Sequence, residues 1–334
     1  MSKSVPSHPF VLKWIDFTTK PFKSVIIAQK SRGFRLKTIA ILGPTASGKT
    51  ALSIELALKY NAIILSLDSL SIYREIDIAS AKPTLKERSG VAHFGLDVLL
   101  PCEHFDVTMF FTLYHEAKAF SDRHNQPLII VGGTGFYLKS MMEGLSLRPN
   151  ISLHVKTEVR RLLQNLPTAY ALMCEKDMMY ASKVASNDSY RIEKWLEIFI
   201  ATNTIPSEYL LHGKQAPLLL DIPLFEIETP KEILIDRVKE RTRGMLRAGL
   251  IDEIFGLEKR YARAPQCMKA IGIKEVLDYF DGLYNYTQLE EKIATHTLQL
   301  AKRQRTFNAS QFPPHPKLER GTLQREIEKV LKEF

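Results

Sequence analysis

Residues 43–50 are Gly43-Pro44-Thr45-Ala46-Ser47-Gly48-Lys49-Thr50, and they match the pattern G-x-x-x-x-G-K-[ST] at every position. The preceding run Thr38–Leu42 is apolar and partly β-branched, which predicts a buried strand, and the following run 51–58 is rich in helix formers. A strand, a glycine loop and a helix in this order predict a P-loop, whose backbone N–H groups converge on phosphate oxygens. We expect Lys49 to reach the outer phosphate and the Thr50 hydroxyl to hold Mg²⁺. The alternative is a glycine turn that matches by chance, and both flanking runs argue against it.

Length and composition are those of a globular protein of about two domains. The chain has 334 residues, of which 45% are hydrophobic and 25% charged, and its formal net charge is +9. This mild basic surplus is compatible with a polyanionic partner. The three cysteines, Cys102, Cys174 and Cys267, form no C-x-x-C pair, which offers no zinc site and is typical of a reducing compartment. No apolar run approaches the ~18 residues of a membrane span, so we expect a cytoplasmic protein without a membrane partner.

Strand and helix patterns alternate in the first half of the chain. A second apolar run, 62–67, ends at Asp68, and a third, 127–131, ends at Gly132-Gly133-Thr134. Alternation of this kind predicts an α/β fold, a P-loop NTPase-like parallel sheet flanked by helices. Ligands of such sheets bind beyond the carboxyl ends of the strands, where the P-loop, Asp68 and Thr134 are expected to lie.

Changes in pattern suggest four parts. We expect a poorly ordered extension over 1–36, a catalytic core over 37–145 and 214–312, a helical insertion over 146–213 and a C-terminal tail over 313–334. Within the insertion, Asp188 is a candidate N-cap for a helix with an apolar stripe. Thr229 and Glu232 have the spacing of a capping box, which predicts a helix that ends near Arg247.

Two features bear on the chemistry. Enzymes that hydrolyse ATP on a P-loop normally carry a metal-binding carboxylate at the end of a strand, but the best such strand here ends in Gly132-Gly133-Thr134. Asp68 does end a strand, where an aspartate is as typical of a turn as of a site. Lys302, Arg303 and Arg305 give the C-terminal helical region a positive surplus, which fits either RNA phosphates or a solvated face.

An ordered set of segments extends from about Lys37 to Thr306. Its members are residues 43–50, Asp68-Ser69 with Tyr73, Ala81-Lys82-Pro83, Gly132-Gly133-Thr134-Gly135, Asn187-Asp188 with Arg191, Ala270-Ile271-Gly272 with Lys274, and Ala301-Lys302-Arg303-Gln304. In content and order this set resembles the tRNA dimethylallyltransferase family, of the bacterial type.

The resemblance implies transfer of a dimethylallyl group from dimethylallyl diphosphate to N6 of adenosine 37, beside the anticodon, with release of diphosphate. The P-loop, Gly43 to Thr50, would hold the diphosphate while Mg²⁺ and Lys49 neutralise the departing charge. Arg241 would steady the same group. Asp68 would accept the proton of the attacking amine, and Thr134 would position the reacting groups.

The resemblance also implies contacts with the anticodon stem-loop of tRNA, mostly through phosphates. The residues concerned are Asp68, Ser69, Leu70, Ser71, Thr134, Lys156, Arg191, Lys274, Lys302 and Arg303. The chain departs from the family pattern at Ser71, Lys156, Lys194, Ile273, Phe307 and Ala309. These departures concern RNA recognition and leave the P-loop, Asp68 and Thr134 intact. We expect a monomer.

Two other classes remain open at this point. A P-loop small-molecule kinase would share the P-loop and Asp68 and would bind ATP, but it leaves the helical insertion unexplained. A non-catalytic RNA-binding module would use the basic helix and leaves the strand-end residues unexplained.

Overall fold

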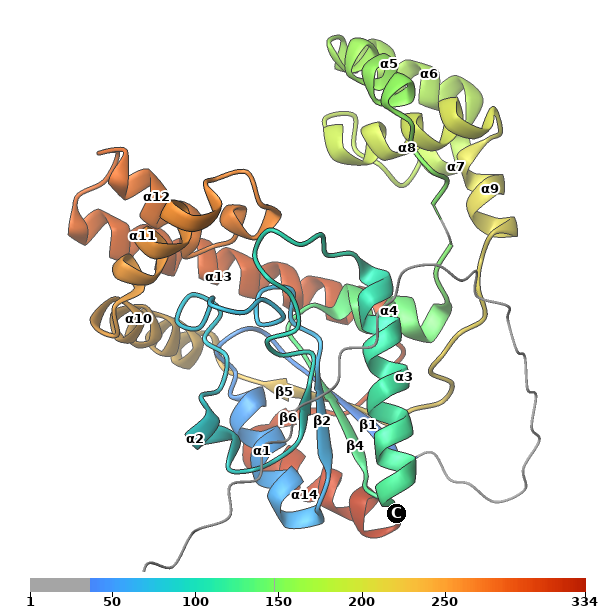
Figure 1. Ribbon diagram of the computed structural model, residues 1–334. Coiled ribbons are helices and arrows are strands. Elements are labelled where there is room, and N and C mark those ends of the chain that lie inside the picture. The colour runs from blue at the N-terminus through green and yellow to red at the C-terminus, as the bar shows by residue number, and fades with distance from the viewer. Residues whose placement is uncertain (1–36, 147) are drawn as a thin grey trace, which may run out of the picture. The chain divides into compact units, whose positions relative to one another are not determined.

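The structure, a computed structural model, describes residues 37–146 and 148–334 (Figure 1). The extension expected over residues 1–36 lies outside this described part. Among the described residues, no helix combines the length and the apolar character needed to cross a membrane.

A sheet of six parallel strands forms the centre of the described chain, in the order β3-β2-β4-β1-β5-β6. The strands are β1 Thr38–Leu42, β2 Ile63–Ser66, β3 His93–Phe94, β4 Leu128–Val131, β5 Leu224–Glu228 and β6 Lys317–Glu319. The strand before the P-loop, β1, is interior: Ile39 pairs with Ile129 of β4, and Leu42 pairs with Glu226 of β5. Parallel pairing throughout confirms the predicted fold class.

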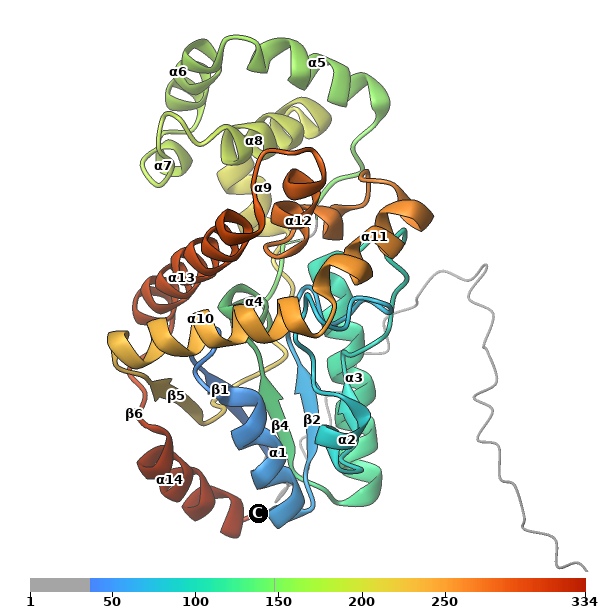
Figure 2. The same ribbon diagram turned by 90° about the vertical axis from the view of Figure 1, so that its left-hand side faces the viewer.

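Helices cover both faces of this sheet (Figures 1 and 2). Those that pack against it are α1 Lys49–Tyr60, α3 Val107–His124, α4 Gly135–Glu143 and α14 Arg320–Lys332. Along β1, Ile39 and Ile41 belong to the core shared with α1 and α14, whereas Ala40 and Leu42 belong to the core shared with α3 and α4. Because both faces are buried, the strands are apolar throughout, as parallel sheets usually are.

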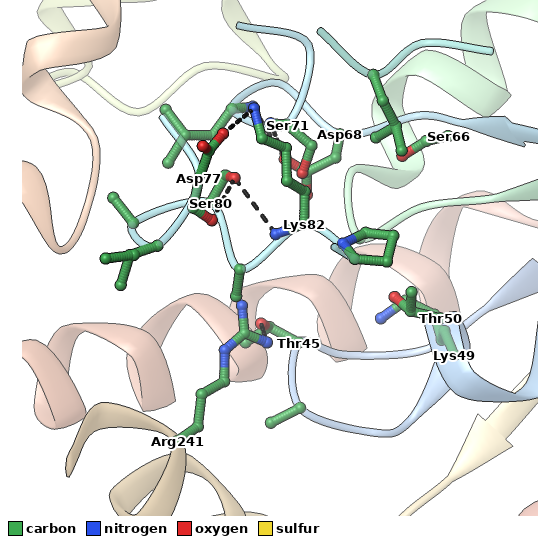
Figure 3. A pocket seen from close by; sticks show the side chains of 18 of the residues that line it. Thr45, Lys49, Thr50, Ser66, Asp68, Ser71, Asp77, Ser80, Lys82 and Arg241 are labelled. Carbon is green, nitrogen blue, oxygen red and sulfur yellow. Dashed lines mark hydrogen bonds and ion pairs between the residues drawn. The ribbon is translucent and has the colours of Figure 1, made fainter. Parts of the chain in front are cut away.

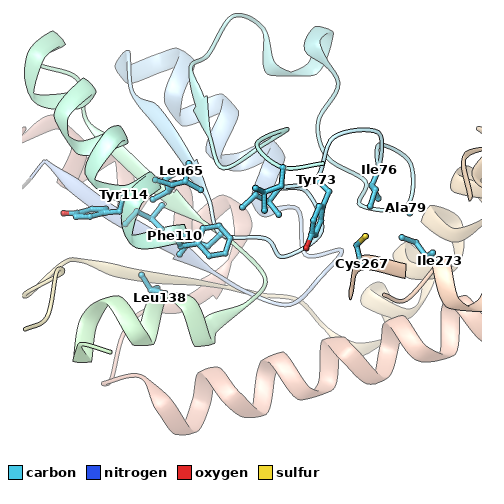
Figure 4. Packing of buried hydrophobic residues seen from close by; sticks show 14 of the residues in the cluster. Leu65, Tyr73, Ile76, Ala79, Phe110, Tyr114, Leu138, Cys267 and Ile273 are labelled. Carbon is cyan, nitrogen blue, oxygen red and sulfur yellow. The ribbon is translucent and has the colours of Figure 1, made fainter. Parts of the chain in front are cut away.

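The core on the α3 side continues beyond the sheet. The further helices of this region are α2 Leu85–Arg88, α10 Lys231–Arg247, α11 Leu250–Tyr261, the 3-10 helix η1 Gln266–Lys269, α12 Ile273–Phe280 and α13 Tyr286–Gln311. Figure 4 shows Leu65 and Phe110 at one end of this core, Cys267 and Ile273 at the other, and Tyr73 between them. The chain after β2 is therefore packed firmly against the C-terminal helices.

The helical insertion has a core of its own. Its helices are α5 Leu153–Leu163, α6 Leu166–Lys176, α7 Met178–Ala181, α8 Ser189–Thr202 and α9 Pro206–His212. Trp195 and Met173 are completely buried in it, and Asp188 caps α8 as predicted by accepting the N–H of Arg191 at 3.0 Å. The two ends of the insertion meet, because the N–H of Gln215 donates to the carbonyl of Leu145 at 3.0 Å.

Residues 313–334 complete the sheet and do not form the expected tail. Lys317 of β6 pairs with Glu226 of β5, and α14 buries Leu323 and Ile327 in the core beneath α1. Pro313 and Pro314 follow the end of α13, but regular structure resumes after them with β6 and α14. The apolar residues of α14 recur every four positions, which is the spacing of a helix packed on one face.

The capping box expected at Thr229 and Glu232 is not formed. Pro230 itself is the N-cap residue of α10, and no side chain caps this helix. Thr229 lies one residue too early to accept the N–H groups of the first turn. The helix ends at Arg247, as predicted.

Candidate active site at the carboxyl edge of the sheet

The P-loop joins β1 to α1. Gly43, Ala46 and Gly48 have φ angles of 145°, 62° and 90°. Such left-handed conformations turn successive N–H groups toward one side, and the concave surface they form binds anions. Gly48 is the N-cap residue of α1, so the N–H groups of the first helical turn add to the same surface.

Three cationic side chains contact this loop. One of them, Arg237 of α10, donates from Nη1 to the carbonyl oxygen of Ser47 at 3.4 Å. Lys49 is 9% exposed, and its Nζ donates to the carbonyl oxygen of Pro44 at 2.6 Å. Arg241 reaches the loop from α10, with Nη1 3.5 Å from Oγ1 of Thr45 (Figure 3). Burial, with the nearby Arg241, lowers the pKa of Lys49 to about 7 although two carboxylates oppose the shift. Burial likewise lowers the pKa of Arg241. An anion bound here would stabilise both charges.

Asp68 follows β2. It accepts hydrogen bonds from the backbone just after it, and it also lines the cleft. Its Oδ1 accepts the backbone N–H groups of Leu70 at 2.9 Å and Ser71 at 3.0 Å. This is the turn that a strand-end aspartate commonly forms. Both hydrogen bonds found for Asp68 among the described residues use Oδ1, so Oδ2 is the oxygen that can meet a substrate. The negative charge of the carboxylate partly opposes the lowering of the pKa values of Lys49 and Arg241.

Thr134 reaches the same edge after β4. A Cβ on Gly132 would lie 2.4 Å from the carbonyl oxygen of Leu67, so only glycine allows the two loops to approach this closely. Leu67 in turn donates its N–H to Val131 at 2.7 Å. Thr134 is the N-cap residue of α4, but its side chain makes no capping hydrogen bond, which leaves the hydroxyl for a ligand.

A cleft of about 1720 Å³ lies over these segments. The expected site residues that line it are Thr45, Ala46, Gly48, Lys49, Thr50, Asp68, Ser69, Leu70, Ser71, Thr134 and Arg241. Gly43, Pro44 and Ser47 belong to the same loop and are buried beneath it. The structure thus brings together residues that follow β1, β2 and β4 with Arg241 of α10, although these segments are far apart in the sequence.

The basic residues expected at tRNA lie outside this cleft. Arg191 of α8 and Lys302 and Arg303 of α13 line a second, more open cavity of about 660 Å³. Lys156 on α5 and Lys274 on α12 are exposed and line neither cavity.

Lys82 has a structural role in the loop after β2. Its Nζ pairs with Asp77 at 2.7 Å (Figure 3). It also pairs with Asp97 at 2.5 Å and donates to the carbonyl of Tyr73 at 2.8 Å. From α11, Glu253 accepts three backbone N–H groups of the same loop, at distances of 2.8 to 2.9 Å. These contacts fix the segment that begins with Asp68.

Sequence reasoning assigned no role to two polar residues beside the P-loop. Gln304 of α13 accepts the N–H of Thr45 through Oε1 at 2.8 Å. Glu226, on the strand next to β1, is 5% exposed and is bonded by Asn308 at 3.0 Å and His315 at 3.1 Å. The available signal was the position of Gln304 and Asn308, four residues apart, so that both lie on the side of α13 that carries the buried Ala301.

The chain is similar to proteins of known activity over most of its length. A model of the IPP transferase family matches residues 71–311. The tRNA dimethylallyltransferase of Sulfurovum sp. (strain NBC37-1) is 48% identical over 297 residues, which cover 89% of this chain and 97% of that protein. The tRNA dimethylallyltransferase of Nautilia profundicola is 51% identical over 274 residues, which cover 82% and 92% of the two chains.

Two solved structures are also similar. The tRNA delta(2)-isopentenylpyrophosphate transferase from Staphylococcus epidermidis has a TM-score of 0.61 and 30% identity, and the match covers 89% of this chain and 99% of that one. A eukaryotic dimethylallyltransferase acting on tRNA has a TM-score of 0.68 and 27% identity, and the match covers 81% of this chain and 69% of that one.

Proposed function

Because the chain belongs to the IPP transferase family and transfers a dimethylallyl group to tRNA, we propose that its donor is dimethylallyl diphosphate and its acceptor the N6 atom of adenosine 37. The observation that carries this proposal is a single cleft that contains the P-loop, the cations Lys49, Arg237 and Arg241, and a strand-end carboxylate. Such a cleft can hold a diphosphate leaving group and an acceptor amine side by side. The modified tRNA and free diphosphate would be the products.

The donor half of the cleft suits a leaving diphosphate. The loop N–H groups would bind its oxygens, and Lys49 and Arg241 would face the negative charge that grows as the allylic carbon–oxygen bond breaks. The bonding electron pair leaves with the diphosphate oxygen. No hydrolytic water is needed, which accounts for a glycine instead of a carboxylate at the end of β4.

Mg²⁺ fits the same half of the site. Thr50 is exposed and lines the cleft at the start of α1. Hydroxyl and phosphate oxygens are the hard ligands that Mg²⁺ prefers. The ion would add positive charge at the leaving group.

The acceptor half centres on Asp68. The exocyclic amine of adenine is a weak nucleophile, since its lone pair is delocalised into the ring. As N6 forms its bond to the allylic carbon, Oδ2 of Asp68 would accept the proton that the nitrogen loses. Thr134, beside it, would help to orient the amine.

The second cavity suits the RNA around adenosine 37. Arg191, Lys302 and Arg303 bring three positive charges to one concave surface. Charges of this kind would bind the phosphates of the anticodon stem-loop, with Lys156 and Lys274 contributing from exposed positions. Adenosine 37 would have to leave its stack to enter the first cleft. We expect the reaction to take place in the cytoplasm.

A transfer assay tests the proposal. The full-length protein is incubated with Mg²⁺, tRNA and labelled dimethylallyl diphosphate, and the modified nucleoside is identified after digestion. A parallel reaction contains γ-labelled ATP in place of the prenyl donor. We expect label on adenosine 37 in the first reaction only. Phosphate transfer from ATP, or prenylation of a different nucleotide, would contradict the proposed substrates.

A further inference from the structure

Gln304 closes one end of the P-loop. Its Oε1 accepts the backbone N–H of Thr45 at 2.8 Å, across 259 positions of sequence. A Cβ on Gly133 would lie 2.7 Å from Nε2 of the same side chain. The carboxamide is therefore held between the P-loop and the loop that carries Thr134, and it lines the large cleft.

Three backbone donors of the loop are free for an anion, whereas the N–H of Ser47 donates to the carbonyl of Pro44 at 3.3 Å. The described residues provide no hydrogen-bond acceptor for the backbone N–H groups of Ala46, Gly48 and Lys49, and these residues line the cleft. At the other end of the loop, Pro44 has no backbone N–H, and the N–H of Thr45 donates to Gln304. Pro44 and Thr45 therefore offer an anion no free backbone donor.

The contrast between free and bonded backbone donors limits how many phosphates the loop can bind. In P-loop proteins that bind nucleoside triphosphates, the loop cradles the inner phosphates and the lysine reaches the outer ones, so the chain extends past the lysine. A third phosphate in this cleft would meet the Gln304 carboxamide and find the Thr45 donor already bonded. Two phosphates need only the donors from Ala46 onward.

We propose that Gln304 is the specificity-determining residue that makes this P-loop select a diphosphate over a triphosphate. The inference rests on the proposed function, since it concerns the diphosphate of the donor. It also gives α13 a role at the donor, in addition to the RNA contacts proposed for its exposed face.

Competition by inorganic anions tests this role. Inhibition constants of Mg²⁺-pyrophosphate and Mg²⁺-tripolyphosphate are measured against dimethylallyl diphosphate for the full-length enzyme and its variants. In Gln304→Ala, the space and the Thr45 donor become available, and we expect the preference for pyrophosphate over tripolyphosphate to fall about tenfold, as for loss or gain of one well-placed hydrogen bond. Gln304→Glu keeps an acceptor of the same reach and adds negative charge, so it should keep the preference of the wild type or increase it.

Gln324→Ala is the matched control. Gln324 lies on α14, and the one side-chain partner that the described residues give it is Glu328 of the same helix, so its loss should leave the ratio of the two constants unchanged. An unchanged ratio in Gln304→Ala, or a ratio that falls equally in Gln304→Glu, would overturn the role of Gln304. If Gln304→Ala does not fold, a fall of the ratio in Gln304→Asn, whose amide is one methylene shorter, would support the role and an unchanged ratio would overturn it. Absence of prenyl transfer in the wild type would instead contradict the proposed function.

Discussion

At the scale of single residues, the two carboxylate oxygens of Asp68 have different roles: one accepts backbone hydrogen bonds, and the other is available to a substrate in the cleft. Oδ1 accepts two backbone N–H groups and so fixes the orientation of the carboxylate. A carboxylate held in this way needs no reorganisation before it accepts a proton, which favours a positioned base. The turn and the proposed catalytic role are thus compatible in one residue.

We expect Asp68→Asn to separate these two roles. The amide oxygen can still accept the N–H groups of Leu70 and Ser71, so the fold and tRNA affinity should be preserved. The amide nitrogen cannot take a proton, so single-turnover prenyl transfer should slow by about 10²–10⁴-fold, the usual contribution of a general base. Asp236→Asn, an exposed aspartate on α10, is the control. Equal losses of rate and tRNA affinity would identify Asp68 as an RNA contact only.

Lys49 predicts a pH dependence of diphosphate binding. Its pKa of about 7 in the ligand-free protein means that it is protonated below pH 7 and loses its charge as the pH rises. Binding of pyrophosphate requires the ammonium, so the affinity should weaken above pH 7 by up to about tenfold per pH unit. Lys49→Arg stays charged, and comparison with it removes the titration of pyrophosphate itself. Parallel pH profiles for the two proteins, measured by calorimetry, would contradict this assignment.

At the scale of elements, α13 serves two sites with two faces. Its inner face carries the half-buried Gln304, which contacts the P-loop, and its exposed face carries Lys302 and Arg303, which line the second cavity with Arg191. A rigid helix that carries both sets of residues holds the proposed RNA contacts at a constant distance from the donor site.

The exposed face can be tested through salt dependence. If Lys302 and Arg303 bind phosphates, Lys302→Gln/Arg303→Gln should weaken tRNA binding and lower the slope of log Kd against log salt by about one unit per contact. Lys329→Gln/Lys332→Gln on α14 is a control with the same change of charge. A slope equal to that of the wild type would show that the two residues form a solvated face.

At the scale of the whole molecule, the described chain contains separate cores for separate tasks. The sheet and its helices form the cleft. The helices of the insertion form a separate core, in which Trp195 is buried. The chain enters and leaves the insertion at one place, where Gln215 donates to Leu145. The insertion is therefore a candidate for removal without damage to the sheet.

We expect replacement of residues 147–213 by a short Gly-Ser turn to leave a protein that unfolds cooperatively. Its affinity for Mg²⁺-pyrophosphate should change little, because none of the insertion's described residues, 148–213, lines the large cleft. Its affinity for tRNA should fall at least tenfold with the loss of Arg191 and its surroundings. Retained tRNA affinity would show that the core alone binds the RNA.

The P-loop, the cap of α8 and the strand-end positions of two site residues could be predicted from the sequence. The P-loop is encoded within a few residues, because β1, the glycines and α1 are adjacent and their conformations depend on local sterics. The cap of α8 by Asp188 is local in the same way. The strand-end positions of Asp68 and Thr134 followed from a general property of parallel sheets.

Tertiary structure alone decided the rest. Gln304 contacts Thr45 only because α13 packs across the carboxyl edge of the sheet, and β6 joins β5 only because the chain returns after Pro313 and Pro314. Neighbours that are close in sequence constrain each other through backbone geometry, and that constraint can be deduced from residue types. Contacts between distant segments depend on how whole apolar faces fit together, and no short stretch of sequence specifies that fit.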